Sequence, residues 1–213
     1  MSDFSEEKLL KDCPHCDPDS FALKHPLEET GNFWVICDVH PISKGHVLII
    51  PKKHLSCIGE YPENIFKEFT ELYKKFSKFI AYEYGSISTF EHGKISQTVF
   101  HSHVHLLPFK GKAIDIVPEG MDKLNEIKTI DKLKDIYKKE GNYLFFSIGN
   151  KMWVVDTVIA KPRFFRDRFA NALGSEQKGN WKEMDTNEDL MSEAKRDISE
   201  LENRWSEFGQ NNN

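Results

Sequence analysis

The segment Gln97-Thr98-Val99-Phe100-His101-Ser102-His103-Val104-His105-Leu106-Leu107 carries three histidines at alternate positions. Successive side chains of a β-strand point to opposite faces, so a strand over residues 99–107 puts the three imidazoles on one face of a sheet. The apolar residues between them indicate that the opposite face is packed. Three interpretations stay open at this point: histidines on a solvated surface, a three-histidine metal site, or phosphate chemistry in which one imidazole attacks phosphorus.

Strand and helix patterns precede this segment. Residues 32–38 and 46–50 are rich in aromatic and β-branched residues and predict a hairpin. Residues 62–84 predict a helix, because apolar side chains recur there at steps of three and four and Gly85 follows. Residues 86–90 predict one more strand before the histidines.

The chain changes character after the histidine segment. Two lysine-rich stretches with weak patterns cover residues 110–141. Apolar runs on either side of Gly149-Asn150 predict a second hairpin. Helices are expected over residues 162–173 and 188–205. The asparagine-rich tail from residue 209 is expected to be disordered.

Composition limits the class of protein. The chain has 213 residues, of which 39% are hydrophobic and 30% are charged, the balance of a globular protein. Its formal net charge of −5 gives no global basic field for nucleic acid. No apolar run approaches the roughly 20 residues that span a bilayer, and the acidic, polar start differs from a signal peptide. We therefore expect a cytoplasmic protein with neither a nucleic-acid nor a membrane partner.

Two of the four cysteines, Cys13 and Cys16, form a Cys-x-x-Cys pair, and residues 1–12 before them predict a short polar helix. In a cytosolic chain this spacing favours a metal or a redox pair over a structural disulfide. The redox alternative is weaker, because no βαβ pattern surrounds the pair. A pair without any metal remains an alternative. Cys37 lies in an apolar run and is expected to be a small buried side chain.

Two blocks of the sequence resemble the histidine-triad (HIT) family. Residues 97–107 are similar to the signature His-φ-His-φ-His-φ-φ, in which φ is apolar, with its Gln-Thr-Val lead-in. Residues 38–54, which read DVHPISKGHVLIIPKKH, are similar to the upstream block of the family. The resemblance implies an α+β fold in which an antiparallel sheet with packed helices forms a HIT domain over residues 10–110. Residues 111–208 are then a C-terminal α/β extension made of a hairpin and helices.

The resemblance also implies a role for individual residues. His103 would attack the α-phosphorus of a nucleotide and form a nucleotidyl-histidine intermediate, which water would hydrolyse. The implied catalytic residues are His103, His105, His46 and His101. The implied substrate contacts are Asp38 at the ribose, and Gln97 and Thr98 at the phosphate and leaving group. For Asp38 an ordinary alternative is the cap of the turn over residues 38–41.

Zinc-bearing members of the family hold their metal through residues whose counterparts here are Cys13, Cys16, His54 and His101. This closed Cys₂His₂ set has no open coordination position, so the implied zinc is structural. His15, between the cysteines, is a weaker candidate ligand.

Two residues depart from the family pattern, and one loop defines a branch. Ser102 occupies an apolar position of the signature, and Ser96 replaces the glycine before the glutamine. The loop Phe90-Glu91-His92-Gly93 resembles that of a zinc-bearing bacterial branch with a Glu-His-Gly loop and a C-terminal extension. Residues 164–181 are similar to the tail of that branch.

The substrate stays open between dinucleoside polyphosphates and nucleoside phosphoramidates. The absence of a His-Pro-His-x-Gln pattern argues against a sugar-phosphate uridylyltransferase. An alternative of another class is a non-catalytic module that binds or senses nucleotides, and the intact histidine set argues against it. Family membership implies a homodimer. The apolar face of the helix over residues 62–84 fits either a core or an interface.

Overall fold

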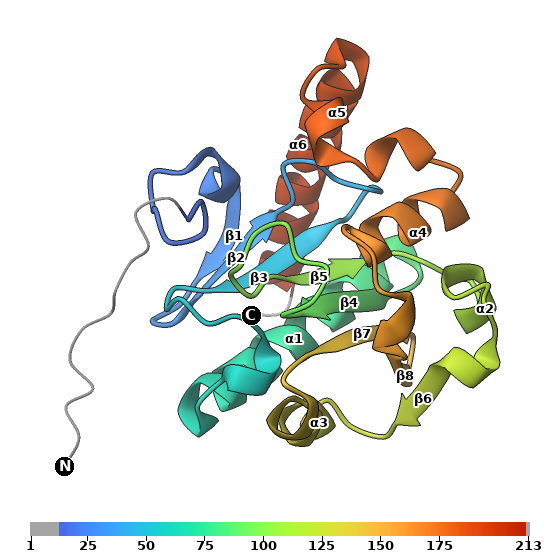
Figure 1. The fold of residues 1–213 in the computed structure, drawn as a ribbon. Coiled ribbons are helices and arrows are strands. Elements are labelled where there is room, and N and C mark those ends of the chain that lie inside the picture. The colour runs from blue at the N-terminus through green and yellow to red at the C-terminus, as the bar shows by residue number, and fades with distance from the viewer. Residues whose placement is uncertain (1–12, 212–213) are drawn as a thin grey trace.

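The computed structural model describes residues 13–211, so the helix expected over residues 1–12 lies outside the described part. Within that part, eight strands form an antiparallel sheet in the order β1-β2-β3-β5-β4-β7-β8-β6 (Figure 1). The predicted α+β class is confirmed. The strands are β1 (Pro26–Glu29), β2 (Phe33–Cys37), β3 (Val47–Pro51), β4 (Ser88–Gly93), β5 (Val104–Leu107), β6 (Leu124–Ile127), β7 (Tyr143–Ile148) and β8 (Lys151–Val155). The helices are α1 (Glu63–Tyr84), α2 (Ala113–Ile116), α3 (Lys132–Glu140), α4 (Phe164–Ala172), α5 (Trp181–Met184) and α6 (Glu188–Asn211).

The first predicted hairpin and the first predicted helix are both confirmed. β2 and β3 pair in antiparallel register, with Cys37 opposite Val47, and Cys37 is buried. Gly85 ends α1 in the left-handed conformation at φ 77°, which glycine adopts without a Cβ clash. The apolar face of α1 packs on the sheet and on α6, where Trp205 stacks on Phe76 with ring centroids 4.3 Å apart. This face therefore belongs to the core of the chain.

The C-terminal extension continues the same sheet. β7 pairs with the whole of β4, from Ser88 opposite Ile148 to Gly93 opposite Tyr143. β7 and β8 form the second predicted hairpin, with Gly149 at φ 56° in the turn. β6, from the lysine-rich stretch, pairs with β8. Since β4 lies between β5 and β7, the extension and the histidine segment share their hydrophobic cores.

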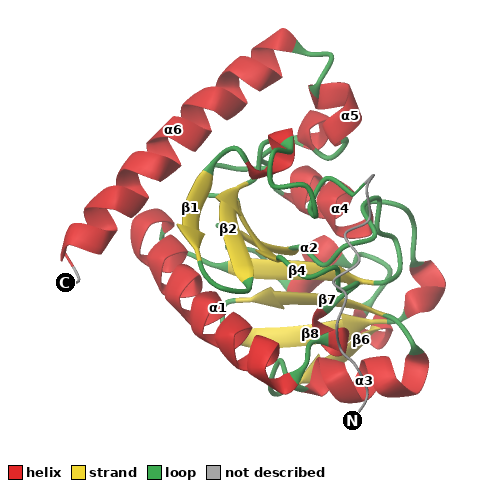
Figure 2. Cartoon of the chain, turned by 90° about the vertical axis from the view of Figure 1, so that its left-hand side faces the viewer, coloured by secondary structure: helices red, strands yellow, loops and turns green. Residues whose placement is uncertain are grey.

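Helices cover both faces of this sheet (Figure 2). On one face α1, α3 and α6 cover a large core that includes Phe69, Leu133 and Leu201. On the other face α2 and α4 cover a second core that includes Phe146 and Phe169. Side chains of β5 alternate between the two faces, because Val104 and Leu106 belong to the first core. The histidine of β5 therefore points to the face that α4 covers.

The prediction of a strand over residues 99–107 is wrong for most of that range. β5 begins only at Val104. Before it, residues 94–103 form an irregular loop in which Lys94 and Ser96 take φ values of 72° and 66°. Strand alternation does not apply in this loop, so the three imidazoles do not share one face. Phe100, expected on a packed face, is 68% exposed.

The disordered tail expected from residue 209 is also corrected, because α6 continues to Asn211. The ring of Phe208 contacts those of Phe79 and Trp205 at 5.2 and 5.9 Å. These contacts stabilise the last turns of the helix, because tertiary packing contributes most of the stability of helices in proteins. No helix within residues 13–211 is long and apolar enough to cross a membrane.

Candidate functional site

A solvent-open pocket with a cavity volume of about 180 Å³ lies on the face of the sheet that α4 covers. The polar side chains of its wall include His15, Thr98, His103 and His105. The apolar side chains include Phe21, Ala22, Leu48 and Trp181.

The loop that carries His103 is held from behind by a buried polar network. The backbone N–H of Ser102 donates to the carbonyl oxygen of Leu55 at 2.6 Å. Its hydroxyl donates to Glu91 at 2.8 Å and accepts from the hydroxyl of Tyr61 at 2.7 Å. Tyr143, on β7, also donates to Glu91. The unusual serine of the histidine signature therefore pairs with the glutamate of the Glu-His-Gly loop.

His103 presents the lone pair of its Nε2 atom. Its Nδ1 lies 2.6 Å from the carbonyl oxygen of His101. A carbonyl only accepts, so Nδ1 carries the proton and the neutral ring keeps its lone pair on Nε2. Burial lowers the pKa of His103, which favours this neutral form at pH 7. The ring is partly exposed and lines the pocket.

A chain of hydrogen bonds fixes the proton on His105. The N–H of Ile42 donates to His46 Nδ1 at 3.1 Å, so the neutral ring of His46 carries its proton on Nε2. That Nε2 lies 2.9 Å from His105 Nδ1, which must then accept. Burial lowers the pKa of His46 to about 4 and that of His105 well below its usual value, so both rings are neutral at pH 7. His105 Nε2–H is thus a buried donor with no partner among the described residues.

Asp38 is buried in the pocket wall and is bonded on both oxygens. Its Oδ1 accepts the N–H of His40 at 2.9 Å, a bond within the turn over residues 38–41. Its Oδ2 accepts from Arg166 Nη1 at 2.8 Å. Burial by itself would raise the pKa of Asp38, but the charge of Arg166 brings it below its usual value. The carboxylate therefore stays ionised and faces the pocket.

α4 of the extension supports this site with three successive contacts. Phe165 N–H, in the first turn, donates to His92 Nε2 at 3.0 Å, which satisfies a donor that the helix leaves free. Arg166 reaches Asp38. Phe169 stacks on Phe90 at 5.1 Å, and the other side of Phe90 stacks on His105 at 4.1 Å.

The glycine of the Glu-His-Gly loop also serves this junction. A Cβ on Gly93 would lie 2.4 Å from the ring of Tyr143. All three residues of the loop motif thus contact the extension, through Tyr143 or Phe165.

The other predicted site residues divide between the pocket and its surroundings. Thr98 lines the pocket. Gln97 does not line the pocket, and its Nε2 donates to the carbonyl oxygen of Ser56 at 2.8 Å. Both ring nitrogens of His101 have partners outside the pocket, namely the carbonyl oxygen of Pro51 and the sulfur atoms of the two cysteines. Its contact with His103 is made by its backbone carbonyl oxygen.

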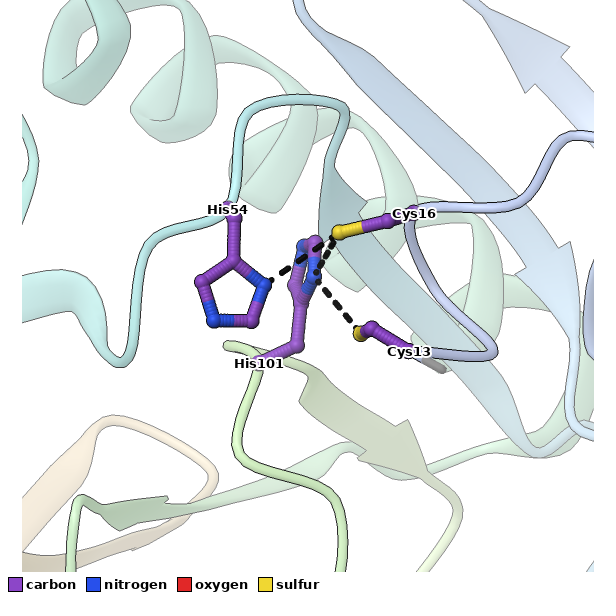
Figure 3. A group of neighbouring side chains, drawn as sticks. All are labelled: Cys13, Cys16, His54 and His101. Carbon is purple, nitrogen blue, oxygen red and sulfur yellow. Dashed lines mark hydrogen bonds between the residues drawn. The ribbon is translucent and has the colours of Figure 1, made fainter. Parts of the chain in front are cut away.

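Cys13, Cys16, His54 and His101 converge as one group, although they come from three separate segments (Figure 3). Their four ligand atoms all lie within 4.8 Å of one another. The Sγ–Nδ1 distances are 3.4 Å from Cys13 to His101, 3.3 Å from Cys16 to His101 and 3.2 Å from Cys16 to His54. Tetrahedral zinc with ordinary Zn–S and Zn–N bonds requires about 3.6 Å between these atoms. The geometry and the donor set therefore fit a metal such as zinc.

The tautomer of His101 also fits a metal ligand. Its Nε2 lies 2.7 Å from the carbonyl oxygen of Pro51, so Nε2 carries the proton and Nδ1 offers its lone pair toward the cysteines.

A second cluster, Asp38, His46 and His105, has ligand atoms that are equally close. It is a poor metal site for two reasons. The guanidinium of Arg166 already neutralises Asp38, and the two imidazoles are bonded to each other.

Sequence reasoning missed several pocket residues, among them His15, Arg166 and Trp181. The sequence suggested a role for His15 only as a zinc ligand. Its ring instead lies 5.1 Å from that of His103, and its Nδ1 is buried with no partner among the described residues. The similarity of residues 164–181 to the tail of a bacterial branch was the only available signal for the other two.

The HIT domain family matches residues 24–112 of this chain. Adenosine 5′-monophosphoramidase HNT1 of Candida albicans is 30% identical over 121 residues, which cover 53% of this chain and 78% of that protein. Protein hit of Bacillus subtilis is 33% identical over 79 residues, 35% of this chain and 54% of that protein. A Zn-bound histidine triad family protein from Mycobacterium smegmatis aligns with a TM-score of 0.40 and 25% identity, over 48% of this chain and 78% of that one.

This chain belongs to the HIT domain family. The family and the class of histidine-triad enzyme predicted from the sequence are thereby confirmed.

Proposed function

We propose that this protein hydrolyses nucleoside 5′-phosphoramidates at the α-phosphorus, with His103 as the nucleophile. The observation that carries the proposal is the pairing of tautomers in the pocket. His103 offers an unprotonated Nε2. His105 offers an Nε2–H without a partner among the described residues, and the centroids of the two rings lie 5.1 Å apart. One atom suits attack on phosphorus and the other suits a bond to a phosphate oxygen.

The reaction proceeds in two displacements. His103 Nε2 bonds to the α-phosphorus while the P–N bond breaks, and the leaving amine takes up a proton from solvent. The carbonyl of His101, bonded to Nδ1–H, stabilises the positive charge that the ring gains. Water then attacks phosphorus and releases one proton to solvent, the P–Nε2 bond breaks, and a nucleoside monophosphate leaves.

The remaining residues bind and orient. His105 Nε2–H donates to a non-bridging oxygen, and Thr98, at the pocket wall, contacts the phosphate or the leaving group. Asp38 accepts one internal bond on each oxygen, which leaves lone pairs for the ribose hydroxyls. Gln97 is not part of this proposal, because it does not line the pocket.

Of the two substrate classes left open by the sequence, we propose phosphoramidates rather than dinucleoside polyphosphates because of the names of the related proteins. Proteins of Candida albicans, Schizosaccharomyces pombe and Saccharomyces cerevisiae named adenosine 5′-monophosphoramidase match this chain, as does one of Arabidopsis thaliana named adenylylsulfatase. All four names describe a bond broken next to an adenylyl phosphorus.

The proposal includes a structural zinc ion held by Cys13, Cys16, His54 and His101. Four protein ligands leave no open position, so the ion would supply no chemistry to the reaction. It would fix the segment that carries Cys13 and Cys16 against the loop that carries His103.

A substrate panel followed by phosphorus NMR tests the function. We expect adenosine 5′-phosphoramidate to be converted to AMP faster than diadenosine polyphosphates or adenylyl sulfate. A protein that binds these nucleotides but turns over none of them would be the binding module considered as the alternative.

A further inference from the structure

We propose that Trp181, on the C-terminal extension, stacks on the nucleobase of the substrate and so determines affinity for base-bearing substrates. This inference rests on the proposed function and adds to it a residue from outside the segment that the HIT family matches, residues 24–112.

The pocket has a polar wall and an apolar wall. The phosphate chemistry belongs to the polar wall around His103 and His105. The apolar wall combines Trp181 with Phe21 and Leu48, from segments far apart in the sequence. A nucleotide has the same two parts, so a phosphate at His103 leaves the base to the apolar wall.

Two aromatic rings of this wall flank His40. The Phe21 ring lies 6.3 Å from it and the Trp181 ring lies 5.8 Å from it. Phe21 is 51% exposed, and Trp181 is partly exposed. Flat π faces that remain accessible inside a pocket are the usual partners of nucleobases.

The position of Trp181 is fixed before any substrate binds. His40 Nε2 is bonded to Asp185 Oδ1 at 2.7 Å, which ties the end of α5 to the pocket wall. Asn180 caps the start of α5, where its side chain accepts the N–H of Lys182 at 3.3 Å. The ring is therefore held between two anchors, so little ordering is needed on binding.

The test compares substrates with and without a base. The probes are adenosine 5′-phosphoramidate and ribose 5-phosphoramidate, assayed with wild type, Trp181→Ala, Trp181→Phe and Lys195→Ala. Lys195 is an exposed residue of α6 that does not line the pocket. We expect Trp181→Ala to raise KM for the adenosine substrate about tenfold, within the range for loss of one base stack. The value of kcat should change little, and KM for the ribose substrate should not change. Trp181→Phe should recover most of the affinity, and Lys195→Ala should resemble wild type.

Equal losses on the two substrates, or no loss on either, would overturn the inference. Calorimetry with AMP and with ribose 5-phosphate separates it from the proposed function, because binding needs no turnover. If wild type hydrolyses neither phosphoramidate, the proposed function fails. The inference then stands only if Trp181→Ala weakens AMP about tenfold and ribose 5-phosphate not at all. A wild type that does not bind AMP overturns it.

Discussion

Arg166 Nη1 donates to Asp38 Oδ2 at 2.8 Å, and this buried ion pair joins the C-terminal extension to the pocket of the HIT segment. Arg166 Nη2 also donates to the carbonyl oxygen of His40 at 2.7 Å. The guanidinium therefore holds both ends of the turn that Asp38 begins.

We expect Arg166→Met to lower the free energy of unfolding by about 3–5 kcal/mol, because it leaves a buried carboxylate without its partner. The double variant with Asp38→Asn should recover part of this loss, since neither group is then charged. Urea denaturation of the two single variants and the double variant measures the coupling. Strictly additive losses would mean that the pair is not coupled.

The ribose contact of Asp38 is tested by a ratio of substrates. Wild type should prefer a ribonucleotide to its 2′-deoxy analogue by about tenfold or more, the effect of a charge-assisted hydrogen bond. Asp38→Asn should reduce this preference toward one. Effects on folding cancel in the ratio of kcat/KM values. If the variant keeps the wild-type preference, Asp38 makes no ribose contact and bonds only to its turn and to Arg166.

Glu91 makes stability depend on pH in a way that can be isolated. Burial raises the pKa of Glu91 to about 7, from a usual value of 4.5. The folded state therefore favours the protonated form, and the resulting stabilisation is complete below pH 4.5 and is lost as pH rises toward 7. The stability of wild type minus that of Glu91→Gln should fall across this window and stay level above it. Subtracting the variant removes the opposite contribution of the buried histidines, and a difference that rises with pH would contradict the account.

The metal prediction is checked by elemental analysis. Purified protein should contain about one equivalent of zinc, and Cys13→Ser should lose both the zinc and thermal stability, because metal binding contributes folding free energy. Cys57→Ser is the matched control, since Cys57 is buried outside the metal group. A metal-free wild type that is equally stable and active would refute the site.

The parts of the structure with strong local patterns could be predicted from the sequence. The spacing of apolar residues predicted α1 and α6, and turn residues predicted both hairpins. The loop before β5 could not be predicted, because alternation of polar and apolar residues is the same in a strand and in this loop. What distinguishes the loop is non-local: the backbone N–H of Ser102 bonds to Leu55 instead of to a neighbouring strand, and its hydroxyl bonds to the buried side chain of Glu91.

The same reason explains the missed part of the site. Motif spacing within residues 38–54 and 97–107 was enough to select His46, His103 and His105. Arg166 and Trp181 lie outside these blocks. They come close to the pocket because β7 of the extension pairs with β4, a contact between distant parts of the sequence.

The central claim, covalent catalysis by His103, is tested most directly by intact-protein mass spectrometry after a rapid acid-free quench with adenosine 5′-phosphoramidate. Wild type should gain the mass of one adenylyl group, and peptide mapping should find it on His103. His103→Ala should fold normally, show no added mass and lose well over nine-tenths of turnover, more than roughly 1.4 kcal/mol in barrier. An adenylyl group mapped to another residue, or a His103→Ala variant that keeps more than a tenth of the wild-type rate, would contradict the account.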